Sequence, residues 1–378
     1  MNHANNNLYI GLMSGTSLDG VDGVLVDLPQ DGSIGSKTRI LASAYQPFSG
    51  AMRSAAMALQ QAGDNEIHQE ALLANQLAAS YASCVSSLLE QAQVTPAHVR
   101  AVGAHGQTIR HRPELGYTRQ TNNPALLAEL CGINIVADLR SRDVAAGGQG
   151  APLVPAFHRA VFGAASTCRV VVNIGGISNI SILHADGRTT GFDTGPGNVL
   201  MDAWIAQHHE KTYDENGAWA KSGKVHAALL AALGDEDYLR LAPPKSTGRD
   251  LFRPEWLNQK LQAFAHLAPA DVQATLCVFT ASTLATAIAQ YASDVSAVYV
   301  CGGGAFNDTL MQQLQAELLL RACSASVAST AQLGVAPNQV EALAFAWLAQ
   351  RFTLRLPGNL PDVTGAKGLR ILGALYPA

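Results

Sequence analysis

The chain has 378 residues, of which 48% are hydrophobic and only 14% charged, and its formal net charge is −4. This length favours two domains, and a mildly acidic chain without runs of Lys or Arg argues against a nucleic-acid partner. Its six cysteines form no C-x-x-C pair, which argues against a zinc-finger site and a disulfide framework. Small molecules are therefore the expected partners. The low charged content also indicates surface buried between lobes or subunits, and we expect a homodimer.

The first residues, MNHANNNLYIGLM, have no basic region followed by a long apolar stretch, and no later segment runs through eighteen apolar residues. We therefore expect no signal peptide and no membrane partner. A cytoplasmic location is the corresponding expectation.

The first half of the chain begins with β-favouring residues on both sides of a glycine-rich stretch. Leu8–Ile10 and Val21–Asp27 predict two strands of a hairpin, and Arg39–Tyr45 predicts a third. Hydrophobic periodicity then predicts an alternation of helices and strands: a helix over 64–93, a strand over 99–104, a helix over 123–132 and a strand over 134–137. The order β-β-β-α-β-α-β follows.

A glycine-rich segment, Asp143–Pro152, is predicted to cross between the two lobes, with Gly147, Gly148 and Gly150 as hinge candidates. Beyond it the β-turn-β plan returns. The expected elements are strands over 169–174 and 179–183, a third strand ending in GFDTGPGN, a helix over 198–209, a strand over 297–301, a helix from 308 and a buried helix over 338–351. The turn-rich tail ends in apolar residues, so we expect it to pack back against a lobe.

The stretch Gly11–Asp22, GLMSGTSLDGVD, has the composition of a phosphate-binding turn. Small residues allow a close backbone approach to a polyphosphate, and hydroxyl and N–H groups supply donors. Asp19 and Asp22 are candidate ligands of Mg²⁺. An ordinary Gly/Ser/Asp hairpin explains this stretch equally well. The candidate phosphate-binding residues here are Gly15, Thr16, Ser17, Leu18, Asp19, Gly20, Val21 and Asp22.

Several familiar nucleotide and hydrolase motifs are absent, namely G-x-x-x-x-G-K-[ST], G-x-G-x-x-G, H-E-x-x-H and G-x-S-x-G. What remains is a set of glycine-rich turns at predicted strand ends: GLMSGTSLDGVD, the pair NIGGISN and GFDTGPGN, and CGGGAFN. A spaced set of this kind is more specific than any one member. The further candidate phosphate-binding residues are Gly175, Gly176, Gly195, Gly197, Asn198, Gly302, Gly303 and Gly304.

This set resembles the actin-like and hexokinase-like ATPase superfamily. The resemblance implies an α/β fold of two ribonuclease H-like lobes, each a mixed β-sheet flanked by helices, around a central nucleotide and sugar cleft. One departure is that Met13 lies near the position where the superfamily usually has an acidic residue. We expect an N-terminal lobe of residues 1–140 plus 355–378 and a C-terminal lobe of residues 141–354.

Longer segments resemble one family, the anhydro-N-acetylmuramic acid kinases. They occur in that family's order: GLMSGTSLDGVD, AHGQTIRH, NPALLAEL, VADLRSRDVAAGGQGAPLVPAFH, NIGGISNIS, GFDTGPGNVLMDAW, PKSTGRDLF, CGGGAFN and EALAFAWLA. The resemblance implies conversion of 1,6-anhydro-N-acetylmuramic acid, with ATP, Mg²⁺ and water, to N-acetylmuramic acid 6-phosphate and ADP. This is a peptidoglycan-recycling step.

The resemblance also implies catalytic roles for Asp193 and Glu341. Asp193 is the expected general base that deprotonates water; the alternative is an aspartate that caps its own turn through Thr194 or Gly195. Glu341 is expected to hold the sugar or the attacking water, and a first-turn glutamate that stabilises its helix is an equal alternative.

Four further residues are candidate substrate contacts: His105, Gln107, Arg140 and Gln149. His105 and Gln107 are expected on a loop after a strand, where a purely structural role is as plausible. Arg140 and Gln149 are either substrate contacts or scaffolding of the crossing segment. Lys245, Ser246 and Thr247 form a polar loop that either touches nucleotide or is a solvated turn.

Two rival functions keep the fold. One is an ATP-driven conformational or assembly protein, which would turn over ATP without sugar. The other is a plain hexose or amino-sugar kinase, which would leave the sugar ring uncut.

Overall fold

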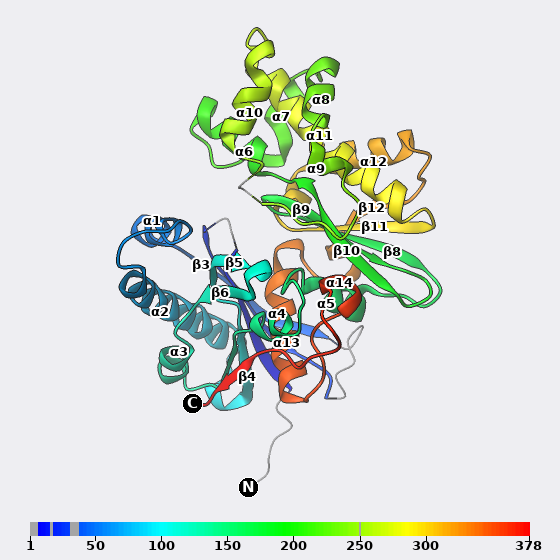
Figure 1. Ribbon diagram of the computed structural model, residues 1–378. Helices are drawn as coiled ribbons and strands as arrows, with labels where there is room; N and C mark the ends of the chain where they lie inside the picture. The colour runs from blue at the N-terminus through cyan, green and yellow to red at the C-terminus, as the bar shows by residue number, and fades with distance from the viewer. Residues whose placement is uncertain (1–6, 16–17, 31–37, 249–250) are drawn as a thin grey trace. The chain divides into compact units, whose positions relative to one another are not determined.

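The computed structural model describes residues 7–15, 18–30, 38–248 and 251–378, and the chain divides into two compact units (Figure 1). Unit 1 comprises Met1–Val161 and Gln339–Ala378, and unit 2 comprises Phe162–Asn338. The sequence-based boundaries, at 140/141 and 354/355, differ from this division. Residues 141–161 and 339–354 group with unit 1, because both segments pack on elements of that unit.

Unit 1 contains a six-stranded mixed sheet in the order β13-β7-β4-β1-β2-β3. The β1–β2 and β2–β3 pairs are antiparallel, and the β1–β4 and β4–β7 pairs are parallel. The predicted opening hairpin and third strand are therefore confirmed. The strands are β1 (Leu8–Met13), β2 (Gly20–Asp27), β3 (Arg39–Pro47), β4 (Val99–Ala104), β7 (Ile135–Ala137) and β13 (Ala374–Tyr376).

Two helices cover opposite faces of this sheet, and glycines on neighbouring strands permit one of them to come unusually close. A Cβ added at Gly11 would lie 1.8 Å from the carbonyl oxygen of Ala342, and one added at Gly103 would lie 2.0 Å from that of Phe345. The helix α13 therefore packs in close contact with the backbone of β1 and β4. On the other face, a Cβ at Gly23 would meet the sulfur of Cys84 in α2. The unit 1 helices are α1 (Gly50–Ala58), α2 (Glu66–Ala92), α3 (Pro124–Cys131), α4 (Ser141–Ala145), α5 (Val154–Phe162), α13 (Val340–Thr353) and α14 (Pro361–Thr364).

The segment predicted to cross between lobes lies inside unit 1, so that prediction is wrong. The buried Asp143 carboxylate accepts hydrogen bonds from Gly150 N (2.8 Å), Asn359 Nδ2 (2.7 Å) and Thr364 Oγ1 (2.8 Å). The C-terminal tail thus folds over the segment that contains Gly147, Gly148 and Gly150, as the tail prediction expected. The chain passes into unit 2 at Val161–Phe162, nine residues after Pro152, and returns to unit 1 at Asn338–Gln339.

A polar hairpin in unit 1 was predicted as a loop. β5 (Gln107–Arg112) pairs antiparallel with β6 (Tyr117–Thr121) as a separate two-stranded sheet. His105 does lie on the loop after β4, but Gln107 is the first residue of β5. The two strands of this hairpin are mostly polar and charged, so they lack the alternation of apolar and polar residues by which a strand is recognised in a sequence.

Unit 2 repeats the topology of unit 1, which confirms the predicted pair of α/β lobes with mixed sheets. Its sheet has the order β10-β9-β8-β11-β12, with β8–β9 and β9–β10 antiparallel and β8–β11 and β11–β12 parallel. The strands are β8 (Cys168–Ile174), β9 (Ile177–Leu183), β10 (Thr189–Pro196), β11 (Val295–Cys301) and β12 (Ser326–Ser329).

The long helix α11 is central to the unit 2 core. Among the described residues it is the one helix long and apolar enough to cross a membrane, and 78% of that stretch is buried inside the structure. Such burial is that of a core helix. The unit 2 helices are α6 (Val199–His209), α7 (Ala218–Ser222), α8 (Ala227–Gly234), α9 (Asp237–Arg240), α10 (Pro254–Leu261), α11 (Pro269–Tyr291) and α12 (Asp308–Leu320).

Candidate active site

Two glycine-rich turns of unit 2 are hydrogen-bonded to each other. Gly175 and Gly176 form the turn between β8 and β9, and Gly197 and Asn198 follow β10. Gly197 N donates to Gly176 O and Asn198 N donates to Gly175 O, each at 2.8 Å. The helix α6 begins at the next residue, so its first N–H groups lie at these turns. A helix N-terminus beside glycine turns is a favourable environment for phosphate oxygens.

The turn after β11 joins the same group. Gly302 has φ +79°, and a Cβ there would lie 2.4 Å from Asn173 Oδ1 and 2.7 Å from Ile174 O, at the end of β8. Only glycine accommodates this backbone and this close approach. We call the combined group, Gly175, Gly176, Gly197, Asn198, Gly302, Gly303 and Gly304, the phosphate cradle.

Asp193 lies on β10, the strand that leads into the cradle. Its Oδ2 accepts a hydrogen bond from Thr247 N (3.0 Å), its own N donates to Lys245 O (3.2 Å), and Tyr238 Oη donates to its carbonyl (2.7 Å). Burial raises the pKa of the Asp193 carboxyl to about 6, and the Thr247 hydrogen bond opposes this rise. Among the described residues, the carboxylate accepts its hydrogen bond from the loop at Thr247 and none from Thr194 or Gly195. It is thus a positioned group whose pKa is close to neutral pH, as a general base requires.

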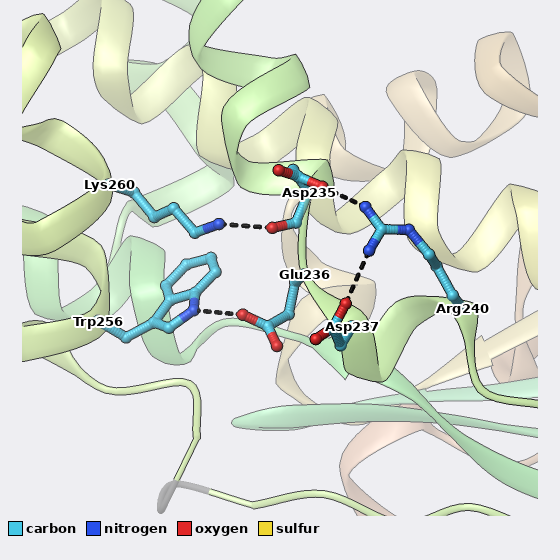
Figure 2. Close-up of polar contacts among 6 residues, drawn as sticks. All are labelled: Asp235, Glu236, Asp237, Arg240, Trp256 and Lys260. Atoms are coloured by element: carbon cyan, nitrogen blue, oxygen red, sulfur yellow. Dashed lines mark hydrogen bonds and ion pairs between the residues drawn. The ribbon is translucent and has the colours of Figure 1, made fainter.

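Tyr238 is carried by the short helix α9, which side chains around it hold in place (Figure 2). Arg240 forms ion pairs with Asp235 and Asp237, Trp256 Nε1 donates to Glu236 Oε2 at 2.8 Å, and Lys260 Nζ donates to Asp235 O at 2.6 Å. Exposed ion pairs each contribute at most about 1 kcal/mol, and these two stay within residues 235–240. The Trp256 and Lys260 hydrogen bonds link the start of α9 to α10.

A cavity of about 240 Å³ has Phe192, Thr194 and Lys245 in its lining. Phe192 and Thr194 flank Asp193 in β10, and Asp193 is not among the residues that line the cavity. The register of β10 against β9 shifts between Asp193 and Gly195, so Thr194 lies at a β-bulge.

Unit 1 contains a second group of acidic side chains, Asp19, Asp22 and Glu341. Asp22 is half-buried, and its pKa is raised from 3.8 to about 7, first by burial and then by the negative charges of Asp19 and Glu341. Burial and Asp19 likewise raise the pKa of Glu341, against the lowering effect of Arg140. Carboxylate oxygens are the ligands that Mg²⁺ prefers, so Asp19 and Asp22 are its candidate ligands, although the oxygens of Asp19, Asp22 and Glu341 do not all lie within 4.8 Å of one another.

Arg140 and His105 form a buried pair beside this acidic group. Arg140 donates through Nε (3.1 Å) and Nη2 (3.0 Å) to His105 Nε2, and through Nη1 to Gly150 O (2.8 Å). Nε2 is thus an acceptor, so His105 Nδ1 carries the proton and faces Ser14 O at 3.2 Å. Burial lowers the pKa of His105 to about 3, which keeps the imidazole neutral. Since both of its ring nitrogens are engaged, His105 positions Arg140.

The remaining predicted residues of unit 1 differ in accessibility. Gln107 Nε2 donates to Gly15 O (3.1 Å), while its buried Oε1 accepts no hydrogen bond from the described residues. Leu18 and Val21 are in the hydrophobic core, so only their backbone groups are able to contact a phosphate. Gln149 is exposed and its N donates to Thr364 O. Thr16 and Ser17 lie outside the described residues.

The structure therefore assembles the sequence candidates into two groups. The cradle and Asp193 belong to unit 2; the acidic group, Arg140, His105, Gln107 and Gly15 belong to unit 1. The sequence analysis did not single out Tyr238. It predicted that the 245–247 loop either touches nucleotide or is a solvated turn, whereas in the structure Thr247 N and Lys245 O are hydrogen-bonded to Asp193. The motif PKSTGRDLF was the available signal for that loop.

Two units that repeat one mixed-sheet topology, with glycine turns at their strand ends, define an α/β protein of two ribonuclease H-like lobes. The family model described as anhydro-N-acetylmuramic acid kinase matches residues 7–378. The chain belongs to the anhydro-N-acetylmuramic acid kinase family, as its motifs predicted.

Curated relatives agree over nearly the full length. The anhydro-N-acetylmuramic acid kinase of Paraburkholderia xenovorans is 58% identical over 371 residues, covering 98% of each chain. That of Burkholderia cenocepacia is 57% identical over 376 residues, covering 99% of this chain and 97% of the relative. Among solved structures, a glucokinase of the ROK family from Streptomyces griseus, in complex with glucose and AMPPNP, aligns at 15% identity and a TM-score of 0.40, covering 90% of this chain and 99% of that chain.

Proposed function

We propose that this chain hydrolytically opens 1,6-anhydro-N-acetylmuramic acid and phosphorylates O6 with ATP. The observation that carries the proposal is Asp193: a buried carboxyl with a pKa of about 6, held on the strand that leads into the phosphate cradle. Family membership supplies the sugar, and the cradle supplies a place for the phosphates.

The chemistry balances as one hydrolysis coupled to one phosphoryl transfer. Asp193 accepts a proton from water, and the water oxygen forms a bond to the anomeric carbon. The bond from that carbon to O6 breaks, and O6 attacks the γ-phosphorus as the bond to the β-phosphate oxygen breaks. The products are the 6-phosphate, ADP and one proton.

The glycine turns of the cradle and the N–H groups of Leu200 and Met201, in the first turn of α6, are proposed to hold the phosphates of ATP, since backbone donors there need no side chain. The N–H of Val199, the first residue of α6, already donates to Gly176 O at 3.1 Å. Gly195 extends this backbone next to Asp193. Gly15, Leu18, Gly20 and Val21 are proposed to contribute backbone groups in unit 1; Thr16 and Ser17 belong to the same candidate set and lie outside the described residues.

In unit 1, Asp19 and Asp22 are proposed to hold Mg²⁺, whose chemistry when bound is neutralisation of phosphate charge. Glu341, Arg140 and Gln107 are proposed to bind the sugar: Arg140 carries positive charge toward the lactyl carboxylate, and Gln107 Oε1 offers an acceptor for a hydroxyl. His105 orients Arg140, and Gln149 is proposed as an outer contact. A homodimeric, cytoplasmic enzyme is part of the same proposal.

The test is ADP release by the full chain with ATP and Mg²⁺. We expect one ADP per molecule of anhydro-sugar consumed, and none when sugar is omitted. Release without sugar would support the assembly-ATPase rival. Release with N-acetylmuramic acid, whose ring bridge is already open, but not with the anhydro-sugar would support a plain kinase.

A further inference from the structure

Three donor side chains of unit 2 meet at the end of its sheet remote from the phosphate cradle. Cys168 is the first residue of β8, His184 follows the last residue of β9, and Asp294 precedes the first residue of β11. Their ligand atoms all lie within 4.8 Å of one another. β9, β8 and β11 are consecutive in the sheet order, so the group arises from the pairing of three neighbouring strands.

We propose that Cys168, His184 and Asp294 form a binding site for Zn²⁺. One thiolate, one imidazole and one carboxylate are the donor types that zinc combines, and three protein donors leave its fourth tetrahedral position for water. A sulfur donor discriminates against Mg²⁺ and Ca²⁺, which prefer oxygen. The site therefore differs in chemistry from the all-oxygen group Asp19, Asp22 and Glu341.

Surrounding contacts position two of the three donors, His184 and Cys168, while Asp294 is exposed. Thr190 Oγ1 lies 3.2 Å from His184 Nε2, and His184 N donates to Arg188 O at 3.0 Å, so both the ring and its backbone are oriented. Ser296 Oγ donates to Cys168 O at 2.8 Å and links the start of β8 to β11. A hydrogen bond to the ring nitrogen that does not bind the metal, as at His184 Nε2, typically strengthens metal binding by a histidine.

Charge also balances when the metal is bound. Binding forms a bond between zinc and the Cys168 sulfur and releases the thiol proton to water. The dication then balances one thiolate and one carboxylate, so the occupied group is neutral.

The expected consequence is a gain in stability, because a metal at this position would link the ends of three neighbouring strands, β9, β8 and β11. β8 spans seven residues between Cys168 and Ile174, which places the site roughly 20 Å from the cradle at about 3.3 Å per residue. Zinc binding should therefore raise the unfolding temperature of the protein and leave phosphoryl transfer unchanged.

The probe is Co²⁺, which replaces Zn²⁺ and reports its ligands by absorption. The full chain, reduced and stripped with a chelator, is titrated with Co²⁺ in excess Mg²⁺. We expect one equivalent to bind with tetrahedral d–d bands and a thiolate-to-cobalt charge-transfer band, and Zn²⁺ to abolish both. Cys168→Ser should lose the charge-transfer band, and His184→Gln or Asp294→Asn should weaken binding by about tenfold or more.

The control is Cys323→Ser, which removes a half-buried cysteine outside the proposed site in the same unit and should leave the spectrum unchanged. Far-UV circular dichroism checks that each variant folds; if Cys168→Ser does not, the His184 and Asp294 variants decide. Absence of the bands at saturating Co²⁺, their persistence in Cys168→Ser, or equal affinity in the His184 and Asp294 variants would overturn the site and indicate an adventitious ion only.

Discussion

Asp193 in unit 2 and Asp22 in unit 1 are both strand aspartates with raised pKa values, yet the causes differ. For Asp193 burial is the raising cause, opposed by one backbone hydrogen bond from Thr247. For Asp22 the neighbouring charges of Asp19 and Glu341 add to burial. An isolated buried carboxyl is suited to exchange a proton, whereas a repelling cluster is suited to bind a cation. The two units repeat one topology, but they do not repeat one chemistry.

Of the substitutions that test the difference between the two aspartates, Asp193→Asn should have the largest effect. Removal of the base should lower kcat by roughly 10² to 10⁴, while ATP affinity measured by calorimetry stays close to that of the wild type, because the cradle is built from backbone groups. The control is Asp186→Asn, an exposed aspartate of the same unit. Undiminished turnover in Asp193→Asn would place the base elsewhere.

Asp22→Asn should mainly alter the use of Mg²⁺. With one carboxylate of the cluster gone, the Mg²⁺ concentration for half-maximal activity is expected to rise by about 10- to 100-fold, by analogy with other losses around metal sites. Asp27→Asn, at the far end of the same strand, is the matched control. An unchanged Mg²⁺ requirement would remove Asp22 from the metal site.

Gly103→Ala tests the close packing of α13, the helix of unit 1 that contains Glu341, against the sheet of the same unit. The new Cβ would lie 2.0 Å from Phe345 O and force α13 away from β4. We expect a loss of about 1–3 kcal/mol in the free energy of unfolding, measured with urea. Gly50→Ala, where a Cβ meets nothing within 4 Å, should be neutral. Equal stability of the two variants would refute the close packing of α13.

The pH dependence sharpens the contrast further. Asp193 acts as a base only when ionised, so kcat should fall below a pH of about 6, by about tenfold at one pH unit lower. The pKa of Asp193 is about 6 in the folded state and 3.8 ordinarily, so the folded state favours the protonated carboxyl. The stability that Asp193 contributes is therefore fully present below pH 3.8, and it is lost as the pH rises through about 6. Asn in its place should therefore raise the unfolding temperature more at pH 8 than at pH 5. An equal gain at both values would contradict the raised pKa.

Tyr238→Phe should give the smallest effect. It removes the hydrogen bond to the Asp193 carbonyl, which is worth about 1 kcal/mol, so kcat should fall by about fivefold with little change in the Mg²⁺ requirement. Tyr213→Phe, an exposed tyrosine of the same unit, serves as the control. A loss as large as that of Asp193→Asn would mean that Tyr238 takes part in the reaction directly.

The sequence was sufficient for features that depend on local pattern. Alternating apolar residues indicated the two β-turn-β units, and glycines at Gly175–Gly176, Gly197 and Gly302–Gly304 indicated the cradle. The prediction did not anticipate that the Gly175–Gly176 turn and the turn after β10 are hydrogen-bonded to each other, because that depends on the pairing of β8 with β9 and of β9 with β10.

Features that depend on long-range contacts could not be predicted. The bond from Thr364 to Asp143 spans 221 residues and holds the glycine-rich segment in unit 1, against the predicted crossing. Tyr238 reaches Asp193 across 45 residues, from a four-residue helix with no periodicity to detect. The His105–Arg140 pair similarly joins two candidates that the sequence left separate.

The most direct test of the account is a single reaction run in ¹⁸O-labelled water with ATP, Mg²⁺ and 1,6-anhydro-N-acetylmuramic acid. If Asp193 activates water against the anomeric carbon, the 6-phosphate product carries the label on its C1 oxygen, fixed before any later exchange by immediate reduction of the sugar. Product that forms with no label at C1 would contradict the role given to Asp193.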